Sequence, residues 1–208
     1  NLEFMKSKPD GYYDLAIVDP PYTDDYECMQ NLNTDMKGKV AKVGKYHYTS
    51  LTNAKPPHEY FVELFRVSKH QIVWGGNYFI NELFPTSCFI VWDKDNTGNF
   101  ADCELAWCSF NSATRKFKWT WNGMLQQNMK NKQKRIHPTE KPIELYRFCL
   151  QNYAKKGWRI LDTHGGSMSI AIAADIEGFD LDITEIDKKY FDSGVKRYEW
   201  HKRQLKLF

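Results

Sequence analysis

Short runs of apolar residues alternate with amphipathic segments along the chain, and this alternation limits the folds open to it. Most of the apolar runs are uninterrupted, which is typical of strands covered on both faces in a mostly parallel sheet. Seven stretches are expected to be strands: 14–19, 71–74, 88–93, 104–110, 116–121, 159–162 and 180–187. Helical spacing predicts helices at 58–68, 143–154 and 169–177, and one from about 187 with Phe191, Val195, Tyr198 and Leu205 facing inward. The alternation predicts an α/β layered fold.

The 208 residues suffice for one core, and neither a repeat nor a linker divides them. We expect one domain over residues 1–208, with a small insert at about 110–136, where the regular pattern gives way to polar residues. No window approaches the roughly 18 apolar residues of a membrane span, so no membrane association is expected. The five cysteines form no C-x-x-C pair, which favours reduced thiols in the cytoplasm and gives no metal site.

One predicted strand ends on Asp162 and is followed by Gly165-Gly166-Ser167, where the backbone could approach a ligand closely at a helix N-terminus. Glu185 closes the next predicted strand 23 residues later, near the spacing at which an acid binds the hydroxyls of a ribose. The pattern suggests a nucleoside-containing cofactor. An ordinary turn stays open as an alternative, since both the G-x-G-x-x-G pattern and a P-loop are absent.

A second predicted strand ends in Asp19-Pro20-Pro21-Tyr22. Two prolines remove two N–H donors, so the backbone presents only carbonyl acceptors there. Asp19 adds two acceptor oxygens and Tyr22 a flat ring, a combination suited to holding an NH₂ group on a planar ring. A rigid turn is the alternative, but roughly one unrelated chain of this length in a thousand would carry these four residues by chance.

Three stretches together resemble the S-adenosylmethionine-dependent DNA amino-methyltransferases, in the permuted class whose catalytic motif precedes the cofactor motif. They are "DLAIVDPPY", "HPTEKPIELYRFCL" and "ILDTHGGS...TEIDKKYF", and the resemblance spans about residues 10–198. It implies a Rossmann-like, mostly parallel seven-stranded sheet with helices on both faces. The last strand is expected to be antiparallel, and a target-recognition insert is expected ahead of the H-P-T-x-K-P segment.

The resemblance also implies residue roles. Asp19 and the Pro20 carbonyl, beside Pro21, would bind the target amine, and Tyr22 would stack on a base flipped out of the duplex, where the amine is otherwise inaccessible. The residues expected around S-adenosylmethionine are Asp162, His164, Gly165, Gly166, Ser167, Glu185, Thr139 and Lys141.

Three residues depart from the family's D-P-F-x-G-S-G pattern: Thr163 replaces a proline, His164 an aromatic residue and Met168 the second glycine. We expect the His164 ring beside the cofactor, with an ordinary packed histidine as the alternative. Met168 is expected to crowd the cofactor, which keeps open a silent, DNA-binding descendant.

The net charge of +3 conceals an uneven distribution, because residues 36–58 and 105–139 carry basic residues and no acid. Together they hold 12 of the 29 basic residues, so the rest of the chain has 17 bases against 26 acids. Solvated loops are one interpretation. Contact with the phosphates of double-stranded DNA is the other, and the candidate residues are Lys42, Lys45, Lys130, Lys132, Lys134 and Arg135.

Together with the resemblance, D-P-P-Y at Asp19–Tyr22 predicts a DNA adenine-N6 methyltransferase. The family more often associates S-P-P-Y, which this segment lacks, with cytosine-N4 methylation. Cytosine-N4 methylation and a catalytically silent DNA-binding protein are the alternatives. A cognate restriction endonuclease is a candidate partner, and both a monomer and a homodimer stay open.

Overall fold

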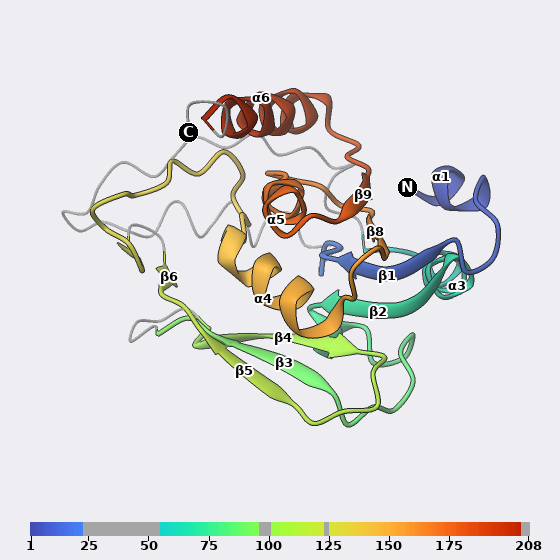
Figure 1. The fold of residues 1–208 in the computed structure, drawn as a ribbon. Helices are drawn as coiled ribbons and strands as arrows, with labels where there is room; N and C mark the ends of the chain where they lie inside the picture. The colour runs from blue at the N-terminus through green and yellow to red at the C-terminus, as the bar shows by residue number, and fades with distance from the viewer. Residues whose placement is uncertain (23–54, 96–100, 123–124, 205–208) are drawn as a thin grey trace.

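The computed structural model describes residues 1–22, 55–95, 101–122 and 125–204 and contains a seven-stranded sheet flanked by helices (Figure 1). In their order across the sheet, the strands are β5 (Arg115–Lys118), β3 (Phe89–Asp93), β4 (Cys103–Cys108), β2 (Ser68–Trp74), β1 (Tyr13–Val18), β8 (Arg159–Asp162) and β9 (Asp180–Ile183). All seven predicted strands are present, and the α/β fold is confirmed. The bounds differ most at four ends: β2 begins three residues earlier, at Ser68, while β4, β5 and β9 stop earlier, at Cys108, Lys118 and Ile183.

One strand of this sheet is reversed. β4 pairs antiparallel with both β2 and β3, whereas β1 is parallel to β2 and β8, and β8 is parallel to β9. The expectation that the last strand is antiparallel is therefore wrong for β9, the last strand in the chain. A parallel connection needs a crossover of a dozen or more residues, and the chain from Asp93 to Cys103 is too short for one, so β4 turns back beside β3.

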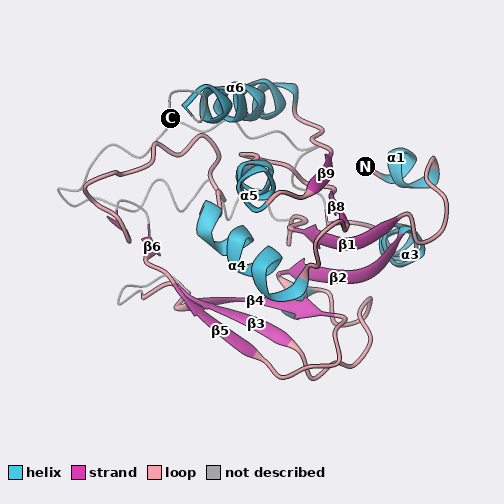
Figure 2. Ribbon diagram, in the orientation of Figure 1, coloured by secondary structure: helices cyan, strands magenta, loops and turns pink. Residues whose placement is uncertain are grey.

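The sheet is covered on both faces (Figure 2). α4 (Ile143–Tyr153) and α5 (Ser169–Glu177) pack on one face, and α1 (Leu2–Lys6) and α3 (His58–Val67) pack on the other. Successive side chains of a strand point to opposite faces. In β1, Leu15 and Ile17 accordingly join the core under α4 and α5, while Ala16 and Val18 join the core under α3. This explains the uninterrupted apolar run.

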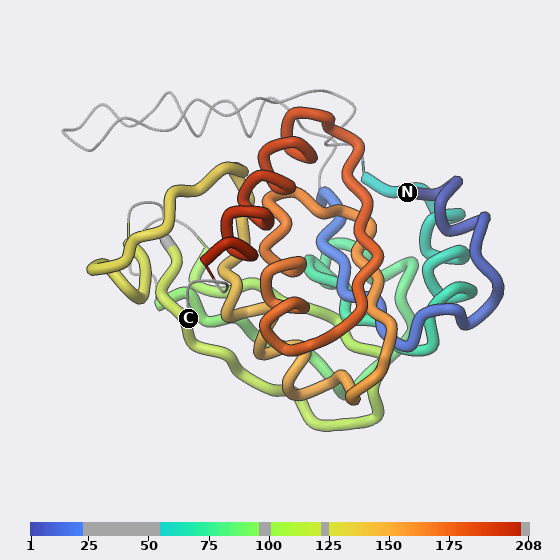
Figure 3. The backbone as a smooth tube through the Cα atoms, turned by 45° about the horizontal axis from the view of Figure 1, so that its top comes forward, coloured from blue at the N-terminus to red at the C-terminus, as the bar shows by residue number. Residues whose placement is uncertain are grey.

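The last helix, α6 (Lys188–Gln204), lies beside α5 in both views of the backbone (Figures 1 and 3). Its inward face is offset from the prediction, because Tyr190 and Gly194 are buried and Phe191 is 42% exposed. The side chain of Met168 sets this register. A Cβ atom at position 194 would lie 2.7 Å from Met168 Cγ, so only glycine lets the helix approach so closely. Leu205 lies outside the described residues.

The predicted insert at 110–136 is divided between two places. Its β5 segment extends the main sheet beside β3, while β6 (Trp121–Asn122) and β7 (Leu125–Gln126) form a separate two-stranded sheet. The assignment of this segment as a recognition insert stays a prediction. No helix among the described residues combines the length and apolar character needed to cross a bilayer.

Substitution of Gly194 by Ala tests the contact with Met168. Alanine normally stabilises a helix interior by about 1 kcal/mol relative to glycine, but here the added methyl group overpacks a buried contact. We expect a loss of about 1–3 kcal/mol in the free energy of unfolding, measured by urea denaturation. In a Met168→Ala background the same substitution is expected to cost nothing. A stabilising effect of Gly194→Ala in the wild-type background would contradict this account.

Candidate active site

The two strand ends singled out in the sequence lie side by side at the centre of the sheet. The chain runs from β1 to β2 on one side, and β8 and β9 lie on the other, so β1 and β8 flank a topological switch point. Open α/β sheets bind ligands beyond the carboxyl ends of their strands at such a point. Asp19–Tyr22 follow β1, and the residues that we call the glycine turn, 163–168, follow β8. The parallel pairing of β1 with β8 places both at the same edge.

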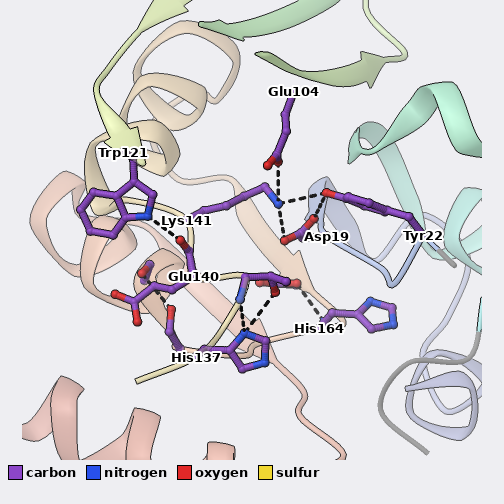
Figure 4. A network of polar contacts seen from close by, with 12 residues as sticks. Asp19, Tyr22, Glu104, Trp121, His137, Glu140, Lys141 and His164 are labelled. Atoms are coloured by element: carbon purple, nitrogen blue, oxygen red, sulfur yellow. Dashed lines mark hydrogen bonds and ion pairs between the residues drawn. The ribbon is translucent and has the colours of Figure 1, made fainter. Parts of the chain in front are cut away.

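Asp19 is the centre of a compact polar network (Figure 4). The hydroxyl of Tyr22 donates a hydrogen bond of 2.6 Å to Asp19 Oδ1, and Lys141 Nζ donates one of 2.5 Å to Asp19 Oδ2. Lys141 Nζ also lies 3.0 Å from the Tyr22 hydroxyl oxygen. Each carboxylate oxygen has two lone pairs, so Asp19 keeps acceptor capacity after these contacts.

Lys141 is the cation of this network and is only 4% exposed. Burial opposes its charge, but the carboxylates of Asp19 and Glu104 outweigh burial and raise the pKa of Lys141 above its ordinary value. Glu104 Oε2 lies 3.2 Å from the ammonium nitrogen. The placement of Lys141 beside the cofactor stays a prediction; in the structure its ion pairs join it to Asp19 and Glu104.

The ring of Tyr22 is held by the turn that follows β2. Gly75 has a φ of +69°, and a Cβ atom there would lie 2.2 Å from the Tyr22 ring, so glycine is required at this position. Tyr78 stacks on Tyr22 with ring centroids 5.1 Å apart and planes 8° from parallel. Tyr78 itself is 53% exposed. An aromatic platform therefore stands at the edge of the network.

The glycine turn is closely packed against the end of β9. A Cβ atom at Gly165 would lie 2.9 Å from the Ile183 side chain, and Gly166 has a φ of +49°. The Gly166 N–H donates a hydrogen bond of 2.7 Å to Glu185 Oε2, and the Asp187 N–H donates one of 2.8 Å to Oε1. Glu185 lies two residues beyond the strand rather than closing it, and its carboxylate faces the turn.

Asp162 contributes a buried carboxyl group to the same place. Its Oδ1 accepts a hydrogen bond of 2.9 Å from the His164 N–H, while Oδ2 has no hydrogen-bond partner among the described residues. Burial raises the pKa of Asp162 to about 8, and the negative charges of Asp19 and Glu185 add to this effect. Without a ligand this carboxyl group is therefore largely protonated at neutral pH, and a positive charge bound beside it would favour its ionised form.

The three departures in the glycine turn each have a local partner. The Thr163 hydroxyl lies 2.6 Å from that of Tyr60 in α3 and 2.9 Å from His164 Nδ1. The His164 ring packs edge to face on Tyr60, with centroids 5.4 Å apart. Met168 adopts a left-handed conformation with a φ of +56°, and its side chain packs on Gly194. Its contact with α6 accounts for the position of this side chain.

The H-P-T-x-K-P segment is anchored by side chains that the sequence did not single out. The His137 ring lies 3.8 Å from the Cβ position of Gly166, and burial lowers the pKa of His137 to about 4. The buried Glu140 lies 3.2 Å from Arg197 of α6. Arg197 also donates a hydrogen bond of 3.0 Å to the Ser167 carbonyl oxygen. Thr139 is exposed, with its hydroxyl 3.1 Å from His137 Nδ1.

The basic candidates divide into two groups. Lys130, Lys132 and Lys134 are exposed on a loop that Gln126 closes through two hydrogen bonds of 2.8 Å to the backbone of Gln133. Arg135 is half-buried, with its guanidinium 4.7 Å from the centre of the Trp121 ring, and Trp121 Nε1 donates a hydrogen bond to the Glu140 carbonyl oxygen. Lys42 and Lys45 lie outside the described residues.

Solved structures of DNA methyltransferases share this fold. M1.HpyAVI in complex with S-adenosylmethionine matches with a TM-score of 0.57 and 18% identity, over 94% of this chain and 92% of that one. TTHA0409 of Thermus thermophilus, complexed with S-adenosyl-L-methionine, matches with a TM-score of 0.57 and 14% identity, over 96% and 92%. The cytosine-N4-specific PvuII DNA methyltransferase matches with a TM-score of 0.61 and 13% identity, over 95% and 83%.

No protein of curated function matches the chain by sequence. A family does match: the DNA methylase family of N6 and N4 methyltransferases covers residues 39–196, more than half of the chain. The match begins after Asp19–Tyr22, so it is independent of the D-P-P-Y residues that first suggested the resemblance. The chain therefore belongs to the N6/N4 DNA methylase family, whose members are S-adenosylmethionine-dependent DNA amino-methyltransferases.

Proposed function

We propose that this protein transfers a methyl group from S-adenosylmethionine to the N6 amine of an adenine flipped out of duplex DNA. The observation that carries the proposal is the position of Asp19. Its carboxylate lies at the end of β1, held by Tyr22 and Lys141, beside the buried Asp162 and the glycine turn that follow β8. A base amine and a nucleoside cofactor bound at these two ends would meet at the switch point of the sheet.

The residues after β8 fit the cofactor. Asp162, with its unpartnered buried oxygen, would hold a positively charged group, and Glu185 would accept the ribose hydroxyls. Gly165 and Gly166 leave room for the backbone to approach the ligand, and Ser167 completes the turn. When bound, S-adenosylmethionine supplies a methyl group activated by a sulfonium centre. Thr163, His164 and Met168 pack on Tyr60 and Gly194, so the turn accommodates its three departures from the family pattern through local contacts.

The residues after β1 would act on the amine. Its nitrogen is a poor nucleophile because the lone pair is delocalised into the ring. Asp19 and the Pro20 carbonyl would accept hydrogen bonds from its two N–H groups, draw the nitrogen toward tetrahedral geometry and stabilise the positive charge that grows on it. The ring of Tyr22 would stack on the base. Pro21 fixes the backbone between them.

The exposed lysines Lys130, Lys132 and Lys134 would contact the duplex backbone. Their loop is closed by Gln126, and through Trp121 the same segment is tied to Glu140, next to Lys141. The segment from Trp121 to Lys134 would then bind duplex DNA at its lysines and lie next to Lys141 through Glu140.

Cytosine-N4 methylation uses the same geometry on a smaller ring and is the second candidate. The match to a cytosine-N4-specific enzyme favours it, and D-P-P-Y in place of S-P-P-Y favours adenine. Nucleoside analysis of DNA incubated with labelled cofactor tests the choice. Label in N6-methyladenine is expected, and label in N4-methylcytosine would replace the first proposal with the second. A cognate endonuclease and a cytoplasmic location stay predictions.

Substitution of Asp19 by Asn is expected to lower kcat by about 100-fold or more, because the charged acceptor of the amine is removed while the shape is kept. Cofactor affinity, measured by calorimetry, is expected to change little. Asp14→Asn is the matched control, since Asp14 lies in the same strand at its other end and pairs with Lys69 at 2.7 Å. Methylation at the wild-type rate by Asp19→Asn would refute the proposed role.

Replacement of Lys130, Lys132 and Lys134 by Ala is expected to weaken duplex binding and to flatten its salt dependence. The slope of the logarithm of the binding constant against the logarithm of the salt concentration is expected to change by about 0.9 for each phosphate that the variant no longer neutralises. Fluorescence anisotropy at several salt concentrations measures both. The control replaces Lys69, Lys155 and Lys156, which lie at the opposite edge of the sheet. Equal slopes for the two triple variants would exclude a specific role for the 130–134 loop.

Stability without cofactor should depend on pH through Asp162. Its folded pKa of about 8 lies above the ordinary value of 3.8, so its contribution is fully present below about pH 4 and is lost as the pH rises toward 8. Asp162→Asn removes this dependence. The free energy of unfolding of the variant minus that of the wild type should therefore increase from pH 5 to pH 8, measured by urea denaturation. A constant difference would show that Asp162 does not titrate in this range.

A further inference from the structure

Glu104 is a half-buried acid beside Lys141, and the sequence assigned no role to it. It lies at the amino end of β4, and its Oε2 is 3.2 Å from Lys141 Nζ. Its other oxygen, Oε1, forms a close ion pair with Lys94, which follows β3. The pKa of Glu104 is lowered because the positive charges of Lys141 and Lys94 outweigh burial. Glu104 is thus ionised between two lysines.

The reversed direction of β4 brings Glu104 to this place. Because β4 is antiparallel to its neighbours, its amino end lies at the edge where β2 and β3 end, with Glu104 opposite Trp92. Glu104 shares a face of β4 with Ala106 and Cys108, which belong to the core under α4. Lys141 lies just before α4, so the two side chains meet across this face (Figure 4).

The charges around Asp19 show what Glu104 contributes. Lys141 alone would neutralise Asp19 and weaken it as an acceptor for an amine that becomes positive. With Glu104 included, Asp19, Lys141 and Glu104 together carry a charge of −1, and the ion pair with Lys94 brings the four groups to neutrality; without Glu104 they would carry +1. Tyr22 of the D-P-P-Y segment and Tyr146 of α4 face the same group, and both stay neutral because burial and nearby carboxylates raise the pKa of each phenol. Asp162 at the end of β8 also faces Asp19 and Lys141, and burial raises its pKa to about 8.

We propose that Glu104 is a positioning residue for methyl transfer. It shares the Lys141 ammonium with Asp19, and thereby keeps the two lysines from making the site cationic and leaves Asp19 available to the amine. Lys94 limits this effect from the outer side by pairing with Glu104. The inference rests on the proposed methyl transfer and adds to it a role for β4 and the end of β3.

Two substitutions that change the charge in opposite directions test the proposal through the pH dependence of kcat. Glu104→Gln removes a negative charge, so the acid limb, which reports protonation of an essential carboxylate, is expected to move to lower pH by about one unit. Its plateau is expected to fall by about tenfold, because Lys141 then holds Asp19 more strongly. Lys94→Met removes a positive charge, so its acid limb is expected to move to higher pH.

Glu63→Gln is the matched control, because Glu63 is also ion-paired, to Arg66 at 2.7 Å, but lies on α3 away from Lys141. Its pH profile is expected to overlay that of the wild type. Profiles of Glu104→Gln and Lys94→Met that overlay the wild type, or that move in the same direction, would overturn the proposal. Failure of the wild-type protein to methylate adenine or cytosine at any pH would instead overturn the proposed function, so the two failures are distinguishable.

Discussion

Lys141 places a positive charge in the interior of the protein, and the active-site edge of the sheet is arranged around that charge. Removing an ammonium group from water costs several kcal/mol after relaxation of the protein. Asp19 and Glu104 offset this cost at 2.5 and 3.2 Å. The same contacts fix Asp19, so the interaction that makes the lysine tolerable also orients the acceptor of the D-P-P-Y segment.

A second ion pair joins the parts of the site that come from distant positions in the chain. Arg197 of α6 pairs with Glu140, donates to the Ser167 carbonyl oxygen, and lies 3.3 Å from the Gln133 side chain. These contacts connect the H-P-T-x-K-P segment, which contains Lys141, with the glycine turn and with the loop that carries Lys130, Lys132 and Lys134. Helix α6 can do this because Gly194 lets it lie close to Met168.

Local sequence patterns were sufficient to predict the strands and to locate the two strand ends at the candidate site. The uninterrupted apolar runs predicted all seven strands, and the D-P-P-Y and Gly-Gly-Ser sequences lie where two of those strands end. The prediction for α6 was less successful. Phe191 fits the spacing of an inward face, but in the structure Tyr190 and Gly194 face inward, and Gly194 lies against the Met168 side chain.

The sequence by itself determined the fold class, the family and the two strand ends that carry the proposed site residues, since these depend on residue type and local spacing. Only the tertiary structure decided the partners of those groups. Glu104 reaches Lys141 because β4 is reversed, and Lys141 reaches Asp19 although 122 positions separate them in the chain. Strand direction and the pairing of buried charges are set by packing and electrostatics over the whole domain, and no local pattern encodes them.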